Sequence, residues 1–405
     1  MASPLAGIRI LELANFQMGP AATVMLADLG ADVIKIEDPF GGDLARGIVK
    51  LLGQTIGVAS DRNFYFESIN RNKRSITIDL KKEKGRQVLH RLVGSADAFV
   101  TNVRLGVAER IGADYETLAK LNPRLVYGHA SGYGPKGPDA SKPAFDPLGL
   151  ARSGMMDALT PAGLPPQWPT GAIADQYGAT MLSYAVLAGL VSANLTGRGQ
   201  KVSSSLLGST MFLGQFCANA TLMVQHEQRK FQREEVSNPL QNCYRCADGR
   251  WIFFAMSQPD RHWPSFCAAL GIRSLQHDER YATAETRAEH SAELIAILDG
   301  IFATKSVDEW VATLDKYGVL GFDVVASMSN LVYDPQVIAN RYVVDFDHPV
   351  LGTIKMMGFP ISFEEMPAQV RMPAPELGQH TEEILIELCD YSWNEIAELR
   401  DEAVI

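Results

Sequence analysis

The sequence is poor in cysteine, and the cysteines that it has do not complete a motif. Five cysteines occur in 405 residues, far below the density of a disulfide-stabilised secreted domain. Cys243 and Cys246 form a CxxC pair. A zinc or redox site needs partners at matching spacing, and the sequence has no second pair. We therefore expect free thiols and no metal centre.

Positive charge and long apolar runs are also scarce. The formal net charge is −10, which argues against nucleic acid as the main partner but allows a local basic pocket for an anionic ligand. The longest apolar run lies near residues 184–195, whereas a bilayer span needs about 20 residues. Residues 1–5 lack the basic segment and cleavage pattern of a secretory signal. We expect a cytoplasmic protein without membrane contacts.

The sequence also lacks a glycine-rich turn of the kind that binds phosphate. Residues 8–13 and 31–37 are typical of strands and residues 21–29 of a helix, which predicts a β-α-β unit with parallel strands. Such a unit, with Glu37 at the second strand end, imitates a dinucleotide site. The turn carries only Gly19 where G-x-G-x-x-G is needed. A nicotinamide cofactor is therefore disfavoured, and Glu37 is expected to end a strand or pair locally.

The alternation of strand and helix patterns continues beyond this unit. Further strands are predicted at 75–80, 98–101 and 125–130, and helices at 83–92 and 115–121. The proline-rich segment 139–170 is predicted to be a long structured loop. We predict an α/β protein with a Rossmann-like large domain at residues 1–205, a linker helix at 206–235 and a smaller α+β domain at 236–325.

Asp175 is the residue on which the functional prediction depends. It stands among small residues in the run 171–180, at the start of an apolar stretch with helical spacing. Aspartate is a favoured N-cap and gains from the helix dipole. A capping role therefore stays open beside a catalytic one.

Polar side chains gather near the ends of the predicted strands, where open α/β sheets bind ligands. Gln17 follows the first strand, residues 70–74 precede another, residues 102–104 follow a third with Arg110 nearby, and Lys136 lies in the run 132–138. Basic residues from separate loops suit a phosphate-bearing ligand. Solvated surface charge is the alternative for each of them.

These phrases, in this order, resemble the class III CoA-transferases, which act on formyl-CoA, crotonobetainyl-CoA, phenyllactyl-CoA, 2-hydroxyisocaproyl-CoA and benzylsuccinyl-CoA. The resemblance covers nearly the whole chain. The matching phrases are residues 5–12, 29–37, 72–76 and 132–134, Asp175, and residues 196–202 and 377–381.

The resemblance implies that Asp175 is a nucleophile that carries CoA as an aspartyl thioester, with Gln17 donating a hydrogen bond beside it. It implies no metal, with CoA as part of the acyl-CoA substrate. It also implies that CoA is held by Asn72, Lys73, Arg74, Asn102, Arg104, Arg110 and Lys136.

The sequence differs from the family pattern at two places, and two alternative functions stay open. The glycine lid of formyl-CoA transferase has no counterpart near 237–246, and Asp38 and Pro39 stand where some relatives have basic residues. The related α-methylacyl-CoA racemases use a histidine where this chain has Phe145, before Asp146, and phenylalanine cannot transfer protons. One subunit of a hetero-oligomeric transferase is the other rival.

The resemblance further predicts an interlocked-ring dimer, either with a second copy or with a related subunit. Residues 326–405 are then a return linker and the last part of the large domain. Segments with Phe16, Met18, Phe145, Met155 and Met156 are expected to line the acyl pocket. They favour a bulky or aromatic carboxylic acid as acceptor, with succinyl-CoA or an aryl or alkyl acyl-CoA as donor.

Overall fold

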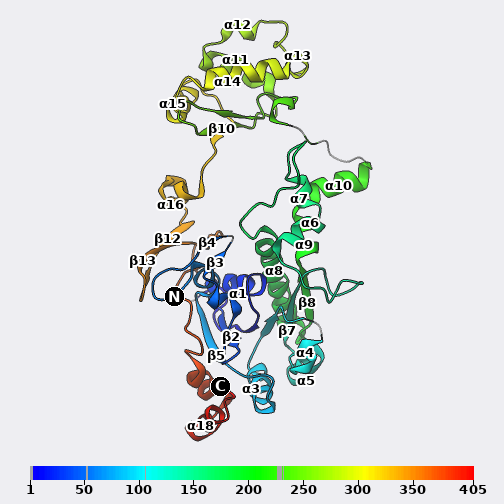
Figure 1. Ribbon diagram of the computed structural model, residues 1–405, viewed down its shortest axis with the longest axis vertical. Coiled ribbons are helices and arrows are strands. Elements are labelled where there is room, and N and C mark those ends of the chain that lie inside the picture. The colour runs from blue at the N-terminus through cyan, green and yellow to red at the C-terminus, as the bar shows by residue number, and fades with distance from the viewer. Residues whose placement is uncertain (1–2, 52, 105, 226–229, 231) are drawn as a thin grey trace. The chain divides into compact units, whose positions relative to one another are not determined.

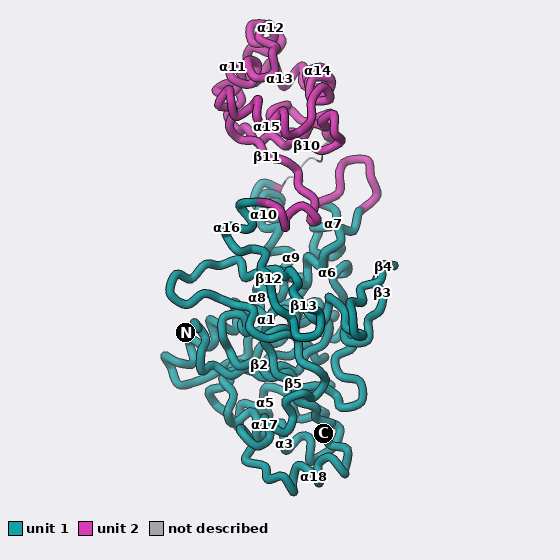
Figure 2. Tube along the Cα trace, turned by 90° about the vertical axis from the view of Figure 1, so that its left-hand side faces the viewer, with its two compact units in different colours: residues 1–157, 167–224, 335–405 teal, residues 158–166, 225–334 magenta. Residues whose placement is uncertain are grey.

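The computed structural model describes residues 3–51, 53–104, 106–225, 230 and 232–405. The chain forms two compact units (Figure 2). The first unit comprises residues 1–157, 167–224 and 335–405, and the second comprises residues 158–166 and 225–334. The first unit is therefore assembled from both ends of the chain.

The first unit is built on a six-stranded sheet (Figure 1). Its strands are β1 (Arg9–Leu13), β2 (Asp32–Glu37), β5 (Lys73–Thr77), β6 (Ala98–Thr101), β7 (Val126–Ser131) and β8 (Lys201–Ser205). Across the sheet the order is β5-β2-β1-β6-β7-β8, and all neighbours are parallel. The direction of winding therefore reverses between β1 and β6, the position at which such sheets bind ligands.

Helices cover both faces of this sheet, so the strands are buried on both sides and are rich in apolar residues. One face packs against α1 (Met18–Asp28) and α8 (Ile173–Thr196), with Leu26 and Leu182 in a shared core. The other packs against α3 (Glu83–Gly94), α5 (Tyr115–Leu121), α17 (Thr381–Cys389) and α18 (Trp393–Asp401). Because Ile384 and Ile396 share a core with Leu89, the C-terminal helices complete the sheet's covering.

The remaining helices and strands are short and lie outside the core of the second unit. They are β3 (Lys50–Leu51), β4 (Gln54–Thr55), α2 (Phe64–Asn70), α4 (Val107–Arg110), α6 (Asp146–Arg152), α7 (Met155–Ala158), α9 (Leu206–Leu213), α10 (Gln215–Val224), α16 (Pro335–Ala339), β12 (Val343–His348) and β13 (Gly352–Met357). The last two form an antiparallel hairpin.

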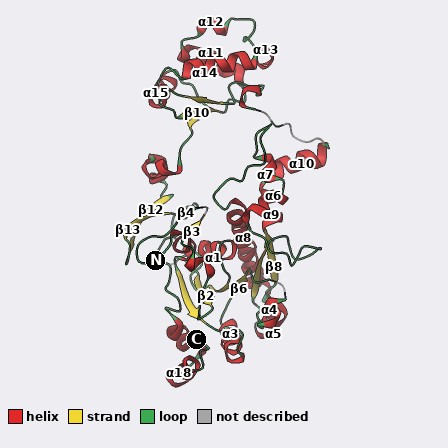
Figure 3. Ribbon diagram, in the orientation of Figure 1, coloured by secondary structure: helices red, strands yellow, loops and turns green. Residues whose placement is uncertain are grey.

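The second unit is a small α+β structure in which helices pack on a short sheet (Figure 3). Its antiparallel strands are β9 (Cys243–Arg245), β10 (Trp251–Phe254) and β11 (Phe322–Val324), and its helices are α11 (Pro259–Leu270), α12 (Arg273–Gln276), α13 (Ala284–Glu289), α14 (Ser291–Phe302) and α15 (Val307–Lys316). Trp263, Trp310 and Phe302 are buried in its core. A turn at Asp248-Gly249 joins β9 to β10, and Gly249 has the positive φ of 81° that such a turn requires.

The structure departs from the sequence prediction in two places. The segment 139–170, predicted to be a loop, contains α6 and α7. The predicted linker helix 206–235 is two helices, α9 and α10, which belong to the first unit and are separated at Gly214, where a β-carbon would lie 2.5 Å from the Met155 sulfur. Residues 226–229 and 231 of that prediction lie outside the described residues.

Helix α8 is longer than the apolar run seen in the sequence. Within the described parts of the chain it is the one helix long and apolar enough, by length and composition, to cross a membrane. Its 24 residues pack against α1, β7 and β8. Burial of one face against the sheet explains why Leu182 and Val186 are apolar.

Candidate functional site

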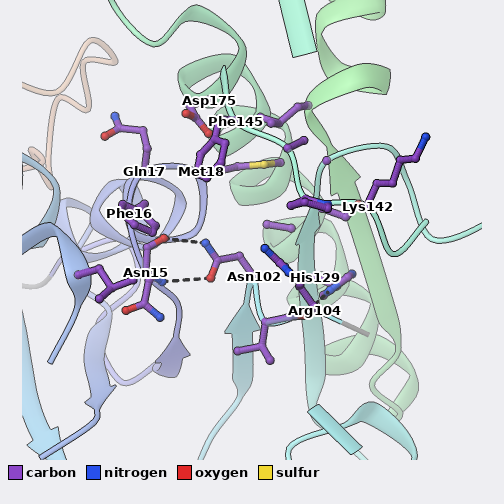
Figure 4. A pocket seen from close by; sticks show the side chains of 18 of the residues that line it. Asn15, Phe16, Gln17, Met18, Asn102, Arg104, His129, Lys142, Phe145 and Asp175 are labelled. Carbon is purple, nitrogen blue, oxygen red and sulfur yellow. Dashed lines mark hydrogen bonds between the residues drawn. The ribbon is translucent and has the colours of Figure 1, made fainter. Parts of the chain in front are cut away.

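A cavity of about 500 Å³ opens at the carboxyl ends of β1, β6, β7 and β8, where the strand order reverses. Its volume falls in the range of small-molecule sites, roughly 300–1,000 Å³. Figure 4 shows Asp175 and Arg104 toward opposite ends of the residues that line it. Phe16, Met18 and Phe145 are among the apolar residues of the lining, as expected for a site that encloses an apolar group.

The turn after β1 is fixed by two side chains from elsewhere in the unit. The Asn102 amide, after β6, accepts from the Asn15 N–H at 3.0 Å and donates to the Asn15 carbonyl at 2.6 Å (Figure 4). The Asp43 carboxylate accepts from the Phe16 N–H at 3.1 Å. Phe16 has a φ of 61°, which is uncommon for a bulky residue and persists only where neighbours impose it.

A buried charge cluster lies behind this turn. Glu12 binds Lys35 at 2.6 Å and Lys73 at 2.7 Å, and Lys35 also pairs with Asp43 at 2.7 Å. All four side chains are fully buried. Although burial opposes ionisation, the two lysines lower the pKa of Glu12 to about 2. The cluster therefore anchors Asp43, which in turn holds Phe16.

Gln17 follows in the same turn and is only 6 % exposed. Its side-chain amide forms no hydrogen bond within the described part of the chain, and Oε1 is buried without a partner. Its residue lines the cavity together with Asp175 (Figure 4). The amide is thus unused by the protein, unlike a turn glutamine bonded to its own backbone.

Asp175 occupies the first turn of α8, as the sequence predicted, but it is not the residue that caps the helix. Residue Ala172 at the N-cap has a left-handed conformation and supplies no side-chain bond. Instead Asp146, at the start of α6, accepts from the Ala174 N–H at 2.7 Å and the Asp175 N–H at 3.1 Å. The Asp175 carboxylate is therefore free of a capping duty, and it accepts no hydrogen bond from any described residue.

The ionisation of Asp175 is set by its surroundings. Burial, and after it the negative charge of Asp146, raise the pKa of Asp175 to about 7. The helix start was expected to favour the charged form, but desolvation and a like charge outweigh it. Burial and the charge of Asp175 also raise the pKa of Tyr65, another lining residue, so its phenol stays protonated near neutral pH.

The opposite end of the cavity is cationic. Arg104 lies there and forms no ion pair within the described part of the chain. Lys142, another residue of the cavity lining, pairs with Asp139 at 2.7 Å. His129 is nearly buried there, with Nε2 3.1 Å from the Val103 carbonyl oxygen. Burial lowers the pKa of His129, so the imidazole is neutral at physiological pH. Such an end suits an anionic group.

Two other basic residues predicted to contact CoA, Arg110 and Lys136, are exposed and lie outside the cavity lining. Arg110 ends α4, in the segment that follows Arg104, and Lys136 lies between Gly134 and Lys142 in the segment after β7. The loop after β6, which precedes α4, and the loop after β7 both contribute residues to the lining, although residues 106–110 do not. Their assignment to CoA stays a prediction.

The basic run Asn72-Lys73-Arg74 leads into β5 and is not among the residues that line the cavity, so its assignment to CoA stays a prediction. Because the sheet is parallel, the start of β5 lies at the opposite edge of the sheet from the carboxyl ends. Asn72 binds Asp28 at 2.8 Å, Lys73 is held inside the charge cluster, and Arg74 pairs with Asp32 at 2.6 Å. In the sequence the run is typical of a solvated ligand site, but in the structure its side chains are bound to other residues of the first unit.

Asn102, also predicted to contact CoA, forms hydrogen bonds to the turn after β1. Its residue lines the cavity, yet both ends of its amide bind the Asn15 backbone. An amide engaged in this way fixes the turn and has little capacity left for CoA. Glu37, by contrast, behaves as expected, because it forms a bidentate pair with Arg46 at 2.8 Å for each bond.

Three of the five predicted apolar residues line the cavity: Phe16, Met18 and Phe145. The rings of Phe16 and Phe145 meet edge to face with centroids 6.3 Å apart. Met155 and Met156 are not among the lining residues; Met155 instead packs at Gly214. Sequence patterns missed five lining residues, which come from short helices, loops and strand ends without a recognisable motif: Leu44, Ile48, Tyr65, His129 and Lys142.

The arrangement combines a desolvated carboxylate, an unused amide and a distant cationic end in one apolar cavity. A carboxylate of raised pKa is a better nucleophile once ionised, because basicity and nucleophilicity rise together. In the described residues no group of three or more His, Cys, Asp or Glu side chains is arranged to hold a metal ion. The geometry therefore suits covalent chemistry on a substrate that has a reactive centre and a remote anionic group.

Comparison with known proteins adds to this geometry. A sequence profile of CoA-transferase family III matches residues 5–381. The chain is 32% identical over 405 residues to (R)-2-hydroxy-4-methylpentanoate CoA-transferase of Clostridioides difficile, covering 99% of both chains. It is 32% identical over 404 residues to cinnamoyl-CoA:phenyllactate CoA-transferase of Clostridium sporogenes, covering 97% of this chain and 95% of that one. A solved CAIB/BAIF family protein from Brucella suis shares 29% identity with a TM-score of 0.85, over 96% of this chain and 100% of its own.

Proposed function

Because the chain belongs to CoA-transferase family III, we propose that it moves CoA between carboxylic acids through a covalent intermediate on Asp175. The chain is a CoA-transferase. The proposed covalent intermediate rests on the position of Asp175. Its carboxylate has a raised pKa and lines the cavity at the point where the strand order of the sheet reverses. Its main-chain N–H is held by Asp146, so the side chain needs no capping role.

The proposed reaction begins when a carboxylate oxygen of Asp175 attacks the carbonyl carbon of an acyl-CoA. The C–S bond breaks, and CoA leaves as a thiolate from an acyl-aspartyl anhydride. The thiolate sulfur then attacks the Asp175 carboxyl carbon, and the donor acid leaves as a carboxylate. This gives an aspartyl-CoA thioester, which keeps the energy of the original thioester bond.

The acceptor acid completes the cycle by the reverse sequence. Its carboxylate attacks the Asp175 carboxyl carbon, displacing the CoA thiolate and forming a second anhydride. The thiolate attacks the acceptor carbonyl carbon, and Asp175 leaves as a carboxylate. No proton is gained or lost overall. Asp175 must be ionised to begin, so its pKa of about 7 matters for the rate.

Gln17 is proposed to stabilise the oxyanions of these steps. Each attack passes through a tetrahedral oxyanion, which an aimed N–H group stabilises strongly. Support comes from the Gln17 amide, which is buried beside the cavity and unbonded to the described residues. The clamp of Asn102 and Asp43 fixes the backbone just before it.

CoA is proposed to lie with its thioester at Asp175 and its phosphates toward Arg104 and Lys142. Support comes from Arg104, which lies toward the opposite end of the lining from Asp175 (Figure 4), and from Lys142, which also lines the cavity. Arg110 and Lys136, both exposed, are proposed to contribute to the more distant phosphates. Bidentate arginine contacts and lysine point charges both suit phosphate groups.

The acceptor is proposed to be a bulky or aromatic carboxylic acid, with succinyl-CoA or an aryl or alkyl acyl-CoA as donor. The Phe16–Phe145 pair and Met18 give the reactive end an apolar wall. The names of two relatives, which specify (R)-2-hydroxy-4-methylpentanoate and phenyllactate, point the same way. Racemase activity is less favoured, because Phe145 has no proton to transfer.

A second chain, identical or related, is proposed to complete the enzyme as an interlocked dimer in the cytoplasm. Support comes from apolar side chains that stay exposed on two helices. Tyr184, Val191 and Leu195 form one stripe on α8, and Phe216 and Met223 are 81 % exposed on α10. Exposed apolar surface of this kind is typical of a protein interface.

Trapping of the intermediate tests the proposed function. The protein incubated with succinyl-CoA and hydroxylamine should lose activity and carry a hydroxamate at Asp175, detected by peptide mass spectrometry. Hydroxylamine without acyl-CoA is the control and should leave the residue unmodified. Exchange of an α-proton with deuterated solvent in a 2-methylacyl-CoA, without acyl transfer, would instead indicate a racemase.

A further inference from the structure

The first turn of α8 depends on a side chain from another helix. Helix α8 has no side-chain cap of its own, and its entry residues Gly171 and Ala172 both have positive φ, 117° and 52°. The N–H groups of Ala174 and Asp175 are bound by a single oxygen, Oδ1 of Asp146. The position of Asp175 is therefore set through residue 146, 29 residues earlier in the chain.

Helices α6 and α8 pack closely at Gly149, one turn after Asp146. A β-carbon added at Gly149 would lie 2.8 Å from the Leu206 β-carbon and 3.2 Å from the Ala174 β-carbon. Asp146 itself is 6 % exposed, and its second oxygen, Oδ2, is buried without a partner among the described residues. A carboxylate that caps a helix needs only one oxygen. The other leaves its charge unpaired inside the protein.

No described cation balances this charge at Asp175. Ion pairs are absent from Asp146 and Asp175 within the described part of the chain, and α9 has no titratable residue. Helix α1 has only Asp28, which is paired with Arg71. From α2, Tyr65 faces the pair as a protonated phenol. The residues that surround Asp175 therefore offer one like charge, one neutral hydroxyl and the neutral amide of Gln17.

We propose that Asp146 is a positioning residue that holds the main chain of Asp175 through Oδ1 and keeps an uncompensated negative charge beside its carboxylate. The charge makes Asp175 more basic and hence a stronger nucleophile, at the expense of the fraction ionised at low pH. This inference rests on the proposed role of Asp175 as nucleophile. It predicts that geometry and charge can be separated by substitution.

Asp146→Asn and Asp146→Ala make that separation. Asparagine keeps an oxygen that accepts from both N–H groups but removes the charge, whereas alanine removes both. Asp114 offers a matched control, because it caps α5 by accepting from the Thr117 N–H at 2.9 Å and lies outside the cavity. Asp114→Asn should leave the pH profile of the transferase unchanged.

The kinetic test is the pH profile of kcat/KM with a fixed donor and acceptor. Asp146→Asn should move the midpoint of the acid limb down by at least about one pH unit, which is about a tenfold gain in ionised fraction on the acid side. Asp146→Ala should show the same shift with a lower plateau, because the first turn of α8 is released. A midpoint unchanged in Asp146→Asn would overturn the proposal.

A thermal-unfolding cycle tests the charge coupling without any assay of activity. Wild type, Asp146→Asn, Asp175→Asn and the double variant are compared at pH 8 and pH 5. At pH 8 each single substitution should raise Tm and the double variant should gain less than the sum, because either change relieves the same repulsion. At pH 5 the coupling should vanish. Additive effects at pH 8 would contradict the inference, whereas a wild type without acyl transfer would contradict only the proposed function.

Discussion

The side-chain amide of Asn102 binds the backbone of Asn15 at both ends, accepting from its N–H at 3.0 Å and donating to its carbonyl at 2.6 Å. The two residues belong to the loops after β6 and β1, the strands between which the sheet order reverses. Both residues line the cavity, and the bond pair sets the path of the chain into Gln17. The reversal point of the sheet is thereby connected to the position of Gln17, the residue proposed to stabilise the oxyanions.

Asn102→Ala should therefore lower kcat more than it raises KM for acyl-CoA. Two hydrogen bonds of about 1 kcal/mol each are lost, and misplacement of Gln17 by about 1 Å can reduce the rate up to a hundredfold. Steady-state kinetics check this. Asn122→Ala, which removes two side-chain bonds to the Val93 and Ala96 carbonyls elsewhere in the unit, is the control. A pure KM effect for acyl-CoA would return Asn102 to a CoA-binding role.

The reaction should show an acid limb in its pH profile. Because the pKa of Asp175 is raised to about 7, kcat/KM should rise with pH through a midpoint near 7 and then level off. Below that midpoint the carboxyl is protonated and cannot attack. An activity that is constant from pH 5 to pH 8 would be inconsistent with Asp175 as the ionising nucleophile.

The same pKa has a consequence for stability. The folded-state value lies above the ordinary value of 3.8, so ionisation opposes folding as the pH rises from about 4 to 7, and the penalty stays constant above. Asp175→Asn should therefore unfold at a higher temperature than wild type at pH 8, and the difference should disappear at pH 4. Differential scanning calorimetry at the two pH values measures it. A variant less stable than wild type at pH 8 would contradict this sign.

Arg104→Met should weaken binding of the phosphate-bearing part of the substrate. A charge-assisted hydrogen bond contributes about 1.5–3 kcal/mol, so KM for acyl-CoA should rise by about 10- to 150-fold. KM for the corresponding acyl-pantetheine, which lacks phosphate, should be unchanged. Arg74→Met is the control, since Arg74 is bound to Asp32, Glu383 and Glu387 away from the cavity. Equal effects on both thioesters would remove Arg104 from the phosphate site.

Phe145→Ala should reduce the preference for aromatic acceptors. An aromatic pair contributes about 0.5–1.5 kcal/mol beyond its buried area, so the kcat/KM ratio of phenyllactate to acetate should fall by about two- to tenfold. Phe253→Ala, at an exposed phenylalanine of the second unit, is the control. A ratio unchanged in Phe145→Ala would show that the acyl group binds elsewhere in the cavity.

The sequence allowed the sheet and the place of Asp175 to be predicted because both are local patterns. Alternating strand and helix periodicity predicts a parallel sheet, and the apolar spacing after Asp175 predicts a helix start. Gln17 was found in the same way, as a polar residue in the turn after the first strand. Each of these inferences needs only residues close together in the chain.

The partners of these residues were not predictable, because they come from distant segments. Asp146 reaches α8 from a segment whose prolines predicted a loop, and nothing in its local sequence marks a cap for another helix. The run Asn72-Lys73-Arg74 reads as exposed, yet burial of Lys73 depends on Glu12 and Asn70. Charge in a short run shows composition, whereas its burial depends on which strands pair.

Intact-protein mass spectrometry after rapid mixing with succinyl-CoA tests the central claim most directly. We predict that wild type carries a covalent CoA adduct on Asp175, that the adduct disappears when an acceptor acid is added, and that Asp175→Ala forms none while its circular dichroism spectrum is unchanged. Transferase activity in Asp175→Ala should fall by several orders of magnitude. An adduct on another residue, or a tenth of wild-type turnover in Asp175→Ala, would contradict the account.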